Sequence, residues 1–421
     1  MKDNRRKLVP YLIWFIPVLF FAYQFIFRLW PGLMMEDIMQ QFAINATSFG
    51  LLASVYYWGY AGMSIPIAVI LDKYGTKYVL FSCATLCGLA TILFSYTDNW
   101  YMAILSRFLI GMGSAGGFLI TSKVITEWFP KNQYSSMVGF SFAIGLTGAV
   151  YGGRPVNSLV QESGFLKVAI ILGIVSIAIG ILALVFLKNN KNNQTKKIEA
   201  GFKLSDLLSV LSSPAICILA VANLLMVGSL EGFADVWGVN YLTTAFAIDR
   251  GQAAGITSFI FIGMIFGGPI LALAGNYFGN YRVIIACGLG MVIACAIIFY
   301  LELEYNYYIF AGLFLLIGVL CCYQVLIFSV GNELVDVEYI GITIAFLNCI
   351  NMLGGSFFHT IIGKLMDIFW VGSYKEDGVT RLYEVVNYNY ALSIIPICAL
   401  LGSLMVLYIE RKYKTKPLNS L

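Results

Sequence analysis

Residues 68–78 read AVILDKYGTKY, and residues 272–282 read ALAGNYFGNYR. The two stretches start 204 positions apart. This offset aligns identical residues within the two stretches, Ala68 with Ala272 and Gly75 with Gly279. It also aligns Ser54 with Ser258 and Gly59 with Gly263, which precede them. Both stretches end an apolar segment long enough to cross a bilayer, so the repeated unit is built from membrane spans. The offset therefore predicts two tandem halves, each built from membrane spans.

The composition excludes a water-soluble protein. Of 421 residues, 60% are apolar and only 11% are charged, whereas soluble domains carry about 25% charged residues. The same balance excludes disordered, collagen-like and nucleic-acid-binding chains. The nine cysteines lie mostly inside apolar runs without metal-ligand spacing, and the single histidine, His359, cannot complete a zinc site. We therefore expect no metal, no cofactor and no nucleic-acid partner.

Twelve apolar runs meet the length of about 20 residues that a spanning helix needs. They are residues 9–31, 48–71, 77–96, 100–129, 134–158, 165–187, 213–243, 252–275, 281–301, 306–330, 338–369 and 388–410. The first run is too long for a signal peptide and lacks a cleavage site, so we expect it to stay in the mature protein.

The longest polar interruption runs from Lys188 to Asp206 and divides the chain. It predicts an N-terminal bundle (1–187), a cytoplasmic linker (188–212) and a C-terminal bundle with a basic tail (213–421). Within the linker, Leu204 to Leu211 is amphipathic and indicates a segment on the membrane surface.

Basic residues gather on one side of the predicted membrane. Seventeen Lys and Arg residues fall at the termini and in the loops on the side of the linker, against four on the opposite side. Because Lys and Arg mark cytoplasmic loops, we expect both termini in the cytoplasm. Five basic residues remain in or at the edge of spans: Arg28, Arg107, Lys123, Arg154 and Lys364.

Two motifs resemble the major facilitator superfamily, and the resemblance covers essentially the whole chain. Residues 68–77 resemble the signature of the loop between helices two and three, although Ala68 replaces the family's leading Gly. Residues 107–116, RFLIGMGSAG, resemble the signature of helix four. That span ends in Glu127-Trp128-Phe129-Pro130, as in many members that carry organic anions.

The resemblance implies an all-α polytopic membrane protein with 12 transmembrane helices in two pseudo-symmetric six-helix bundles. It also implies a monomer that binds a small-molecule substrate among membrane lipid, in a bacterial inner membrane. The family's cytoplasmic latch maps onto the residues of both loop motifs: Asp72, Lys73, Gly75 and Lys77 in the first, Gly279 and Arg282 in the second. Because Asn276 stands where an acid would be, we expect the second latch to be weaker.

Within the superfamily, residues 23–31 (YQFIFRLWP) resemble carriers of organic anions, organophosphates and sugar acids. An Arg at the place of Arg28 often grips the anionic group of the substrate in those members. Residues 235–239 and Gln324 resemble a bacterial branch that is similar to lysosomal dipeptide carriers and to nutrient importers.

Charges inside a bilayer cost at least about 2.5–3.5 kcal/mol and therefore face a cavity or a partner. Arg28 is the expected substrate anchor, with snorkelling to the outer interface as the alternative. Arg107 either binds substrate or bonds to backbone carbonyls. Arg154 follows a Gly pair and precedes Pro155, which predicts a kinked helix and leaves functional and interfacial roles equally open. Lys123 is four residues before Glu127, a spacing that favours a local ion pair.

Glu231 and Asp235 are spaced to share one face of the seventh span. Two close carboxylates in a low-dielectric site resist double ionisation, so we expect proton coupling at this pair. The alternative is a buried ion pair with an Arg of the other half. His359 is either a satisfied core residue or a proton relay and substrate ligand. Lys364 and Asp367 are expected to pair near the outer end of their span.

Further polar and aromatic side chains complete the predicted substrate contacts. They are Tyr57, Trp237, Gln324 and Asn351, in addition to Arg28, Arg107, Arg154 and His359. Aromatic residues at the membrane interface would give the same pattern.

The predicted function is secondary active transport of an amino acid, short peptide or organic acid by alternating access, with proton-coupled uptake. The alternatives are a solute exchanger, an exporter and a nutrient sensor derived from a transporter. A membrane serine protease would need Ser114 beside His359, and a Gly-x-Ser string is common in packed helices. We therefore do not expect an enzyme.

Overall fold

The structure is a computed structural model that describes residues 2–187, 204–301, 304–375 and 380–413. Twelve helical segments in these ranges are long and apolar enough to cross a membrane, and their bounds follow the predicted spans within a few residues. Apart from one isolated bridge between Tyr374 and Arg381, their regular structure is helical. The predicted all-α fold with twelve spans is confirmed. The linker residues 188–203 lie outside the described ranges.

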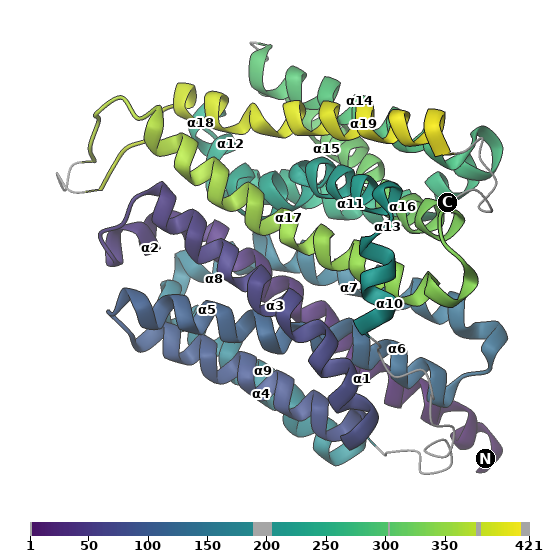
Figure 1. Cartoon of the computed structure of the whole chain (residues 1–421). Coiled ribbons are helices and arrows are strands. Elements are labelled where there is room, and N and C mark those ends of the chain that lie inside the picture. The colour runs from purple at the N-terminus through teal and green to yellow at the C-terminus, as the bar shows by residue number, and fades with distance from the viewer. Residues whose placement is uncertain (1, 188–203, 302–303, 376–379, 414–421) are drawn as a thin grey trace. The chain divides into compact units, whose positions relative to one another are not determined.

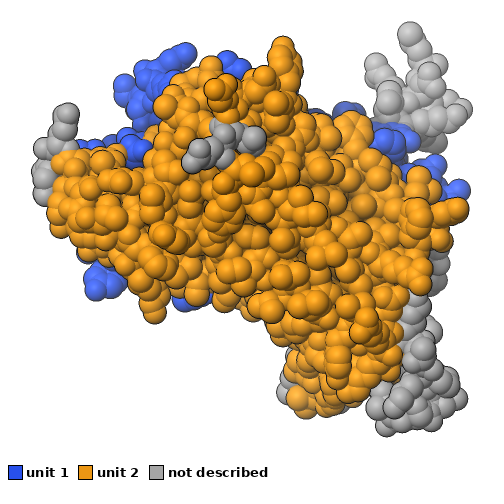
Figure 2. Space-filling model, turned by 90° about the horizontal axis from the view of Figure 1, so that it is seen from above, with its two compact units in different colours: residues 1–44, 51–197 blue, residues 45–50, 198–421 orange. Residues whose placement is uncertain are grey.

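Contacts divide the chain into two compact units, coloured separately in Figure 2. Unit 1 comprises residues 1–44 and 51–197, and unit 2 comprises residues 45–50 and 198–421. The helix α3 is shared, because its first turn belongs to unit 2 and the remainder to unit 1.

Unit 1 contains the first six spans (Figure 1). Its elements are α1 (Lys2–Leu33), α2 (Met35–Gln41), most of α3 (Ala46–Tyr74), α4 (Thr76–Tyr96), α5 (Trp100–Ser114), α6 (Gly116–Trp128), η1 (Lys131–Gln133), α7 (Tyr134–Gly152), α8 (Arg154–Ser163) and α9 (Phe165–Phe186).

Unit 2 contains the last six spans. Its elements are α10 (Leu204–Leu211), α11 (Pro214–Met226), η3 (Gly228–Trp237), α12 (Gly238–Phe246), α13 (Arg250–Phe278), α14 (Asn280–Tyr300), α15 (Tyr307–Cys321), α16 (Tyr323–Glu333), η4 (Val337–Tyr339), α17 (Ile340–Ile368), α18 (Val385–Leu392) and α19 (Ile394–Tyr413).

The internal repeat extends to equivalent helix crossings in the two units. In unit 1, a Cβ added to Gly111 would lie 2.0 Å from the carbonyl oxygen of Tyr56. In unit 2, a Cβ added to Gly318 would lie 2.0 Å from the carbonyl oxygen of Ile260. Tyr56 and Ile260 are 204 positions apart. Both crossings therefore require glycine, because only a residue without Cβ lets two membrane helices touch backbone to backbone.

Helix starts and interruptions repeat as well. Asn99 caps α5 and Asn306 caps α15, each accepting two backbone N–H bonds through its side chain. The fourth span is interrupted at Ala115, and the tenth is interrupted at the equivalent Cys322. The two units are thus variants of one six-helix design.

Each of the two loop motifs turns at a glycine that a residue with a Cβ could not replace without backbone strain. Gly75 precedes α4 with φ +80°, and Gly279 precedes α14 with φ +91°. A left-handed backbone disfavours any residue with a Cβ. This explains why Gly75 and Gly279 match where most of the surrounding sequence has diverged.

The fifth span breaks as its sequence predicts. The helix α7 ends at Gly152, and α8 begins at Arg154 with Pro155 in its first turn. Proline is tolerated there because the first N–H groups of a helix have no intrahelical acceptor.

Candidate functional site

A buried arginine on α5 lies inside unit 1. The side chain of Arg107 is 1% exposed, and its Nη1 donates a hydrogen bond to the carbonyl oxygen of Phe27 at 2.7 Å. That carbonyl lies in α1, six residues before the helix ends, and would normally accept from the residue four positions on, which is Pro31. Proline has no N–H, so Arg107 supplies the missing donor. The architectural hydrogen bond considered for Arg107 is therefore present.

Aromatic rings surround the Arg107 guanidinium. Its Cζ lies 5.0 Å from the ring centroid of Tyr56 and 5.8 Å from that of Trp30. Arg107 has no carboxylate partner among the described residues, and its Nε has no hydrogen-bond acceptor. A desolvated cation held in this way retains a donor for an anion.

Arg28 lies one residue beyond Phe27 on α1. Its side chain is half-buried, and its guanidinium lies 5.1 Å from the ring centroid of Phe25. The bond from Arg107 to Phe27 brings a second cation to the same turn of α1. Arg28 also interacts electrostatically with Tyr56, the ring next to the Arg107 guanidinium.

The other predicted residues of unit 1 divide into two groups. Tyr57 is 1% exposed and packs edge-on against Tyr56, with ring centroids 5.4 Å apart. It therefore belongs to the interior that holds Arg107. Arg154 is exposed at the start of α8 and is not part of this arginine cluster.

The seventh span contains an unexpected helix type in unit 2. Residues Gly228–Trp237 form a π-helix between α11 and α12, and all of them are buried. Its bonds run from residue i to i+5, so residues four positions apart still share one side. Glu231 and Asp235, which are 1% and 3% exposed, are both on this segment. Such π-helical segments are frequent at functional sites.

The Glu231 carboxylate faces the interruption of the tenth span. It interacts electrostatically with Cys321 at the end of α15 and with Tyr323 at the start of α16. The Tyr323 hydroxyl in turn donates a hydrogen bond to the carbonyl oxygen of Asn223, at 3.1 Å. Glu231 therefore lies where two interrupted helices of the unit meet.

The helix α17 packs on the π-helix next to His359. A Cβ on Gly228 would lie 2.6 Å from Cζ of Phe358, and one on Gly232 would lie 3.0 Å from Cβ of Phe358. His359 follows directly in the chain and is fully buried. The close contact of η3 with α17 thus depends on glycine at both positions.

Two amide side chains of unit 2 form an incompletely bonded pair. Asn351 Nδ2 of α17 donates to Gln324 Oε1 of α16 at 3.5 Å. Gln324 Nε2 and Asn351 Oδ1 are buried, and the described chain offers neither of them a hydrogen-bond partner. The pair therefore presents one donor and one acceptor, which a single substrate hydroxyl could satisfy.

Trp237 ends the π-helix and is fully buried. Its ring packs edge-on against Phe49, with centroids 5.8 Å apart. Its indole N–H has no acceptor within the described ranges.

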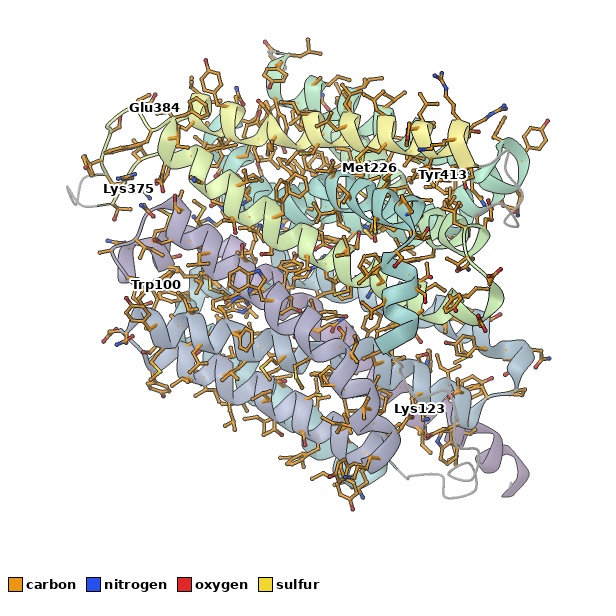
Figure 3. All side chains as sticks on the ribbon, in the orientation of Figure 1. Trp100, Lys123, Met226, Lys375, Glu384 and Tyr413 are labelled. Atoms are coloured by element: carbon orange, nitrogen blue, oxygen red, sulfur yellow. The ribbon has the colours of Figure 1, made fainter. Side chains whose placement is uncertain are left out.

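The first loop motif carries an ion pair with Lys123. Lys123 Nζ lies 2.7 Å from Asp72 Oδ1, with side-chain exposures of 30% and 58% (Lys123 is labelled in Figure 3). The sequence favoured Glu127 as the partner of Lys123. The structure shows that Asp72, 51 positions away, competes for this ammonium group, because α6 passes the end of α3. Lys73 is exposed and Lys77 is half-buried, and they lie over the rings of Tyr74 and Tyr78 respectively.

The second loop motif has a looser ion pair. Arg282 Nε lies 3.9 Å from Glu410 Oε1, and the Arg282 side chain is 74% exposed. Asn280 donates a hydrogen bond to Glu333 at 2.9 Å. The contact of Arg282 is longer than that of Asp72 with Lys123, and the weaker second latch stays a prediction.

One predicted pair is wrong, and one network was missed. Asp367 forms its ion pair with Arg381, at 2.9 Å, and Lys364 is exposed. Helical spacing favoured Lys364, but the loop after α17 returns Arg381 to the helix end. No local pattern in the sequence indicates the ion pair between Asp367 and Arg381. Clusters of three or more metal-ligating side chains are absent from the described residues.

Comparison with known proteins supports a membrane carrier. The family model described as the Major Facilitator Superfamily matches residues 15–359. The chain is 25% identical to a probable sulfoacetate transporter of Cupriavidus necator, over 38% of this chain and 37% of that protein. It is 26% identical to a probable galactarate/D-glucarate transporter of Escherichia coli, over 40% and 42%. It is 24% identical to a putative tartrate transporter of Agrobacterium vitis, over 39% and 38%. These matches span less than half the length of each relative.

Two solved structures share the fold. A bacterial homologue of the human lysosomal transporter Spinster has a TM-score of 0.76 at 13% identity, covering 97% of this chain and 98% of that one. A nucleoside transporter has a TM-score of 0.77 at 12% identity, covering 94% and 98%. All these proteins are named as transporters, which confirms the expectation of a carrier rather than an enzyme.

Proposed function

Because the chain belongs to the Major Facilitator Superfamily, we propose that it takes up a small carboxylate-bearing organic anion by alternating access, coupled to protons. The observation that carries this proposal is the arginine cluster of unit 1. Arg107 is buried, and it donates a hydrogen bond to the turn of α1 that carries the half-buried Arg28. A buried cluster of this kind favours an anionic ligand.

The named relatives support the substrate class. Sulfoacetate, galactarate, glucarate and tartrate, which the relatives' names mention, are all small organic acids with at least one carboxylate. Their partial coverage and low identity leave the individual substrate open. An organic acid fits both these names and the arginine cluster, and it takes precedence over an amino acid or a short peptide.

The two arginines have different proposed roles. Arg28 is the anion anchor, because a guanidinium matches a carboxylate with two parallel N–H bonds. Arg107 is a positioning residue, since its bond to Phe27 holds the turn that presents Arg28. Tyr57 contributes to the wall around them.

The proposed proton site is the carboxylate pair of the π-helix. Glu231 is the proposed proton carrier, and Asp235, four residues on in the same buried π-helix, is its proposed partner. His359, and less directly Arg154, are candidates to complete the network. Unit 1 thus supplies cations for the substrate, whereas unit 2 supplies carboxylates for the proton.

The amide pair and Trp237 refine the substrate class. Gln324 and Asn351 present one buried donor and one buried acceptor, and Trp237 presents one donor. These groups fit a hydroxyl and a further carboxylate oxygen, so we propose a hydroxy acid as the preferred substrate.

The cytoplasmic latch and the topology complete the proposal. Asp72, Lys73, Gly75 and Lys77, with Gly279 and Arg282, belong to the inner face, and both termini lie in the cytoplasm of a bacterial cell. The asymmetry of seventeen basic residues against four supports this orientation. The carrier acts as a monomer.

A proteoliposome assay tests the function. The purified protein would be offered labelled tartrate or glucarate, with and without an inward proton gradient. We expect accumulation that requires the gradient and that Arg28→Ala abolishes, whereas Arg411→Ala on the exposed end of α19 leaves it intact. Saturable uptake that ignores the proton gradient would instead favour an exchanger. Failure of every organic acid to bind or cross would contradict the proposal.

A further inference from the structure

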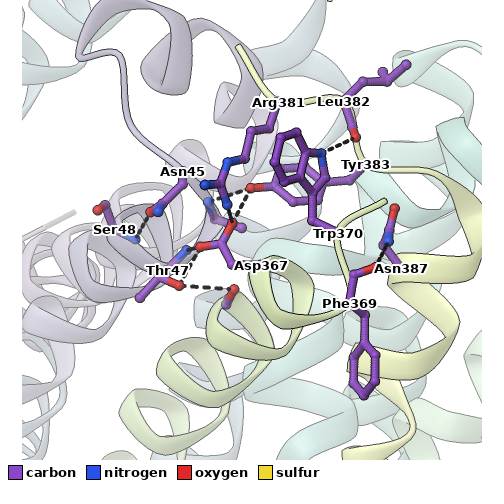
Figure 4. A network of polar contacts seen from close by, with 12 residues as sticks. Asn45, Thr47, Ser48, Asp367, Phe369, Trp370, Arg381, Leu382, Tyr383 and Asn387 are labelled. Atoms are coloured by element: carbon purple, nitrogen blue, oxygen red, sulfur yellow. Dashed lines mark hydrogen bonds and ion pairs between the residues drawn. The ribbon is translucent and has the colours of Figure 1, made fainter. Parts of the chain in front are cut away.

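A single carboxylate at the end of α17 holds the first turn of α3. Asp367 Oδ2 accepts a hydrogen bond from the backbone N–H of Thr47, at 2.8 Å, and another from the Thr47 hydroxyl (Figure 4). The first N–H groups of a helix have no intrahelical acceptor, and the helix dipole there favours a negative charge. Asp367 therefore caps a helix 320 positions away in the sequence.

The loop after α17 holds Asp367 in this position. Arg381 Nη1 donates to Asp367 Oδ1 at 2.9 Å, and the Tyr383 hydroxyl donates to the same oxygen. The Tyr383 oxygen also accepts from the backbone N–H of Ala46, at 3.0 Å. Burial, and next the bond to Asp367, raise the pKa of Tyr383 well above its ordinary value, so the phenol remains a donor.

The loop itself is built around Arg381. The Arg381 guanidinium lies 4.3 Å from the ring centroid of Trp370, whose indole N–H donates to the carbonyl oxygens of Ser373 and Leu382. Asp367 is 11% exposed and Arg381 is 31% exposed. Charge-assisted hydrogen bonds in such a half-dry setting are stronger than neutral ones on the surface.

The backbones of α3 and α17 also touch beside this network. A Cβ on Gly363 would lie 2.3 Å from the carbonyl oxygen of Ala46, and one on Gly50 would lie 2.3 Å from that of His359. The first turn of α3 is thus seated on α17, whereas the rest of α3 belongs to unit 1. The residues after Gly50 continue in the same helix as part of unit 1.

We propose that Asp367, Arg381 and Tyr383 form a releasable latch on the first turn of α3, which opens and closes once in each transport cycle. The latch stabilises the state in which Ala46 and Thr47 are docked. The latch rests on the proposed transport cycle and goes beyond it, because it concerns what holds the first turn of α3 and not what binds the substrate.

Cysteine accessibility tests the latch. The reporter is Ala46→Cys, because Ala46 is fully buried in the docked turn. It would be placed in a chain whose nine natural cysteines are replaced, and the rate of maleimide labelling would be measured on the purified protein without substrate. We expect Asp367→Asn to raise the rate about tenfold or more, since a charge-assisted bond is lost. Tyr383→Phe and Thr47→Val should raise it about two- to tenfold.

The control is Asp249→Asn, at the equivalent helix start in the repeat. Asp249 caps α13 through one bond to the N–H of Gln252, and asparagine retains an oxygen for that bond. Its labelling rate should equal that of the reporter alone. Unchanged labelling in both Asp367→Asn and Tyr383→Phe would overturn the latch. The conservative Tyr383→Phe keeps the test decisive if Asp367→Asn fails to fold.

Discussion

Arg107 donates a hydrogen bond to the carbonyl oxygen of Phe27 at 2.7 Å, and Pro31 is the reason that this carbonyl is available. The fourth span is thereby bonded to the turn of α1 that carries Arg28. One arginine thus fills a gap in the helix backbone while the other remains half-buried. We therefore expect substitution of Arg107 to lower stability and substitution of Arg28 to weaken substrate binding.

Substitution of the two arginines by lysine separates structure from binding. Arg28→Lys should weaken substrate binding by a factor of tens to thousands, about 2–5 kcal/mol, because an ammonium keeps the charge but loses the planar fork. Its thermal stability should stay near that of the parent. Arg107→Lys should lower the melting temperature even without substrate, because the hydrogen bond from the guanidinium to the Phe27 carbonyl oxygen is lost.

Binding by calorimetry and melting by a thermal-shift assay check this pair. The informative control is Arg411→Lys, which lies on the exposed end of α19 and should change neither quantity. A parent-like affinity in Arg28→Lys would show that Arg28 does not grip the substrate.

Neutralising the proton site should uncouple transport. Glu231→Gln preserves shape and removes the titratable group, so exchange of labelled for unlabelled substrate should persist while accumulation driven by a pH gradient disappears. Uptake and exchange in proteoliposomes measure the two processes separately. Glu333→Gln, on α16 near the loop motif, serves as a control. If Glu231→Gln still concentrates substrate, the coupling role passes to Asp235 or His359.

The amide pair should discriminate hydroxylated from plain acids. Gln324→Leu and Asn351→Leu remove the buried donor or acceptor, so each should weaken binding of tartrate by about three- to tenfold, the worth of one hydrogen bond. Binding of succinate, which has no hydroxyl, should be nearly unchanged. Competition assays with both acids measure the ratio. Equal losses for tartrate and succinate would mean that the pair has only a structural role.

The ion pair of the first loop motif should behave as a coupled unit. Asp72→Asn and Lys123→Ala should each shift accessibility of the inner face toward the inward-open state, and the double variant should add little. Because the pair is partly exposed, the coupling is expected at about 0.2–1 kcal/mol. Cysteine labelling at the inner face is measured for the parent, the two single variants and the double variant, with Arg411→Ala as a control. Additive effects would show that Asp72 acts through other partners.

A structural feature can be predicted from the sequence when the residues that determine it are close together in the chain. The spans and the left-handed Gly75 and Gly279 were predictable, because apolar length and glycine chemistry are local properties. The π-helix was not, since no local pattern in residues 228–237 distinguishes it from an α-helix. The pairing of Asp367 was missed because its partners come from a distant helix and a loop.

The repeated glycine crossings supply the most quantitative test of the fold. A Cβ on Gly111 or Gly318 would lie 2.0 Å from a backbone carbonyl oxygen, which no side-chain rotation can relieve. Gly111→Ala and Gly318→Ala should each destabilise the protein by about 1–3 kcal/mol, the usual cost of overpacking. The matched controls are Gly62→Ala and Gly268→Ala, because an added Cβ meets nothing within 4 Å at either position. Since alanine favours a helix over glycine, these controls should be neutral or slightly stabilising. Thermal unfolding in detergent measures all four, and equal melting temperatures for Gly318→Ala and Gly268→Ala would contradict the backbone contact on which the repeat depends.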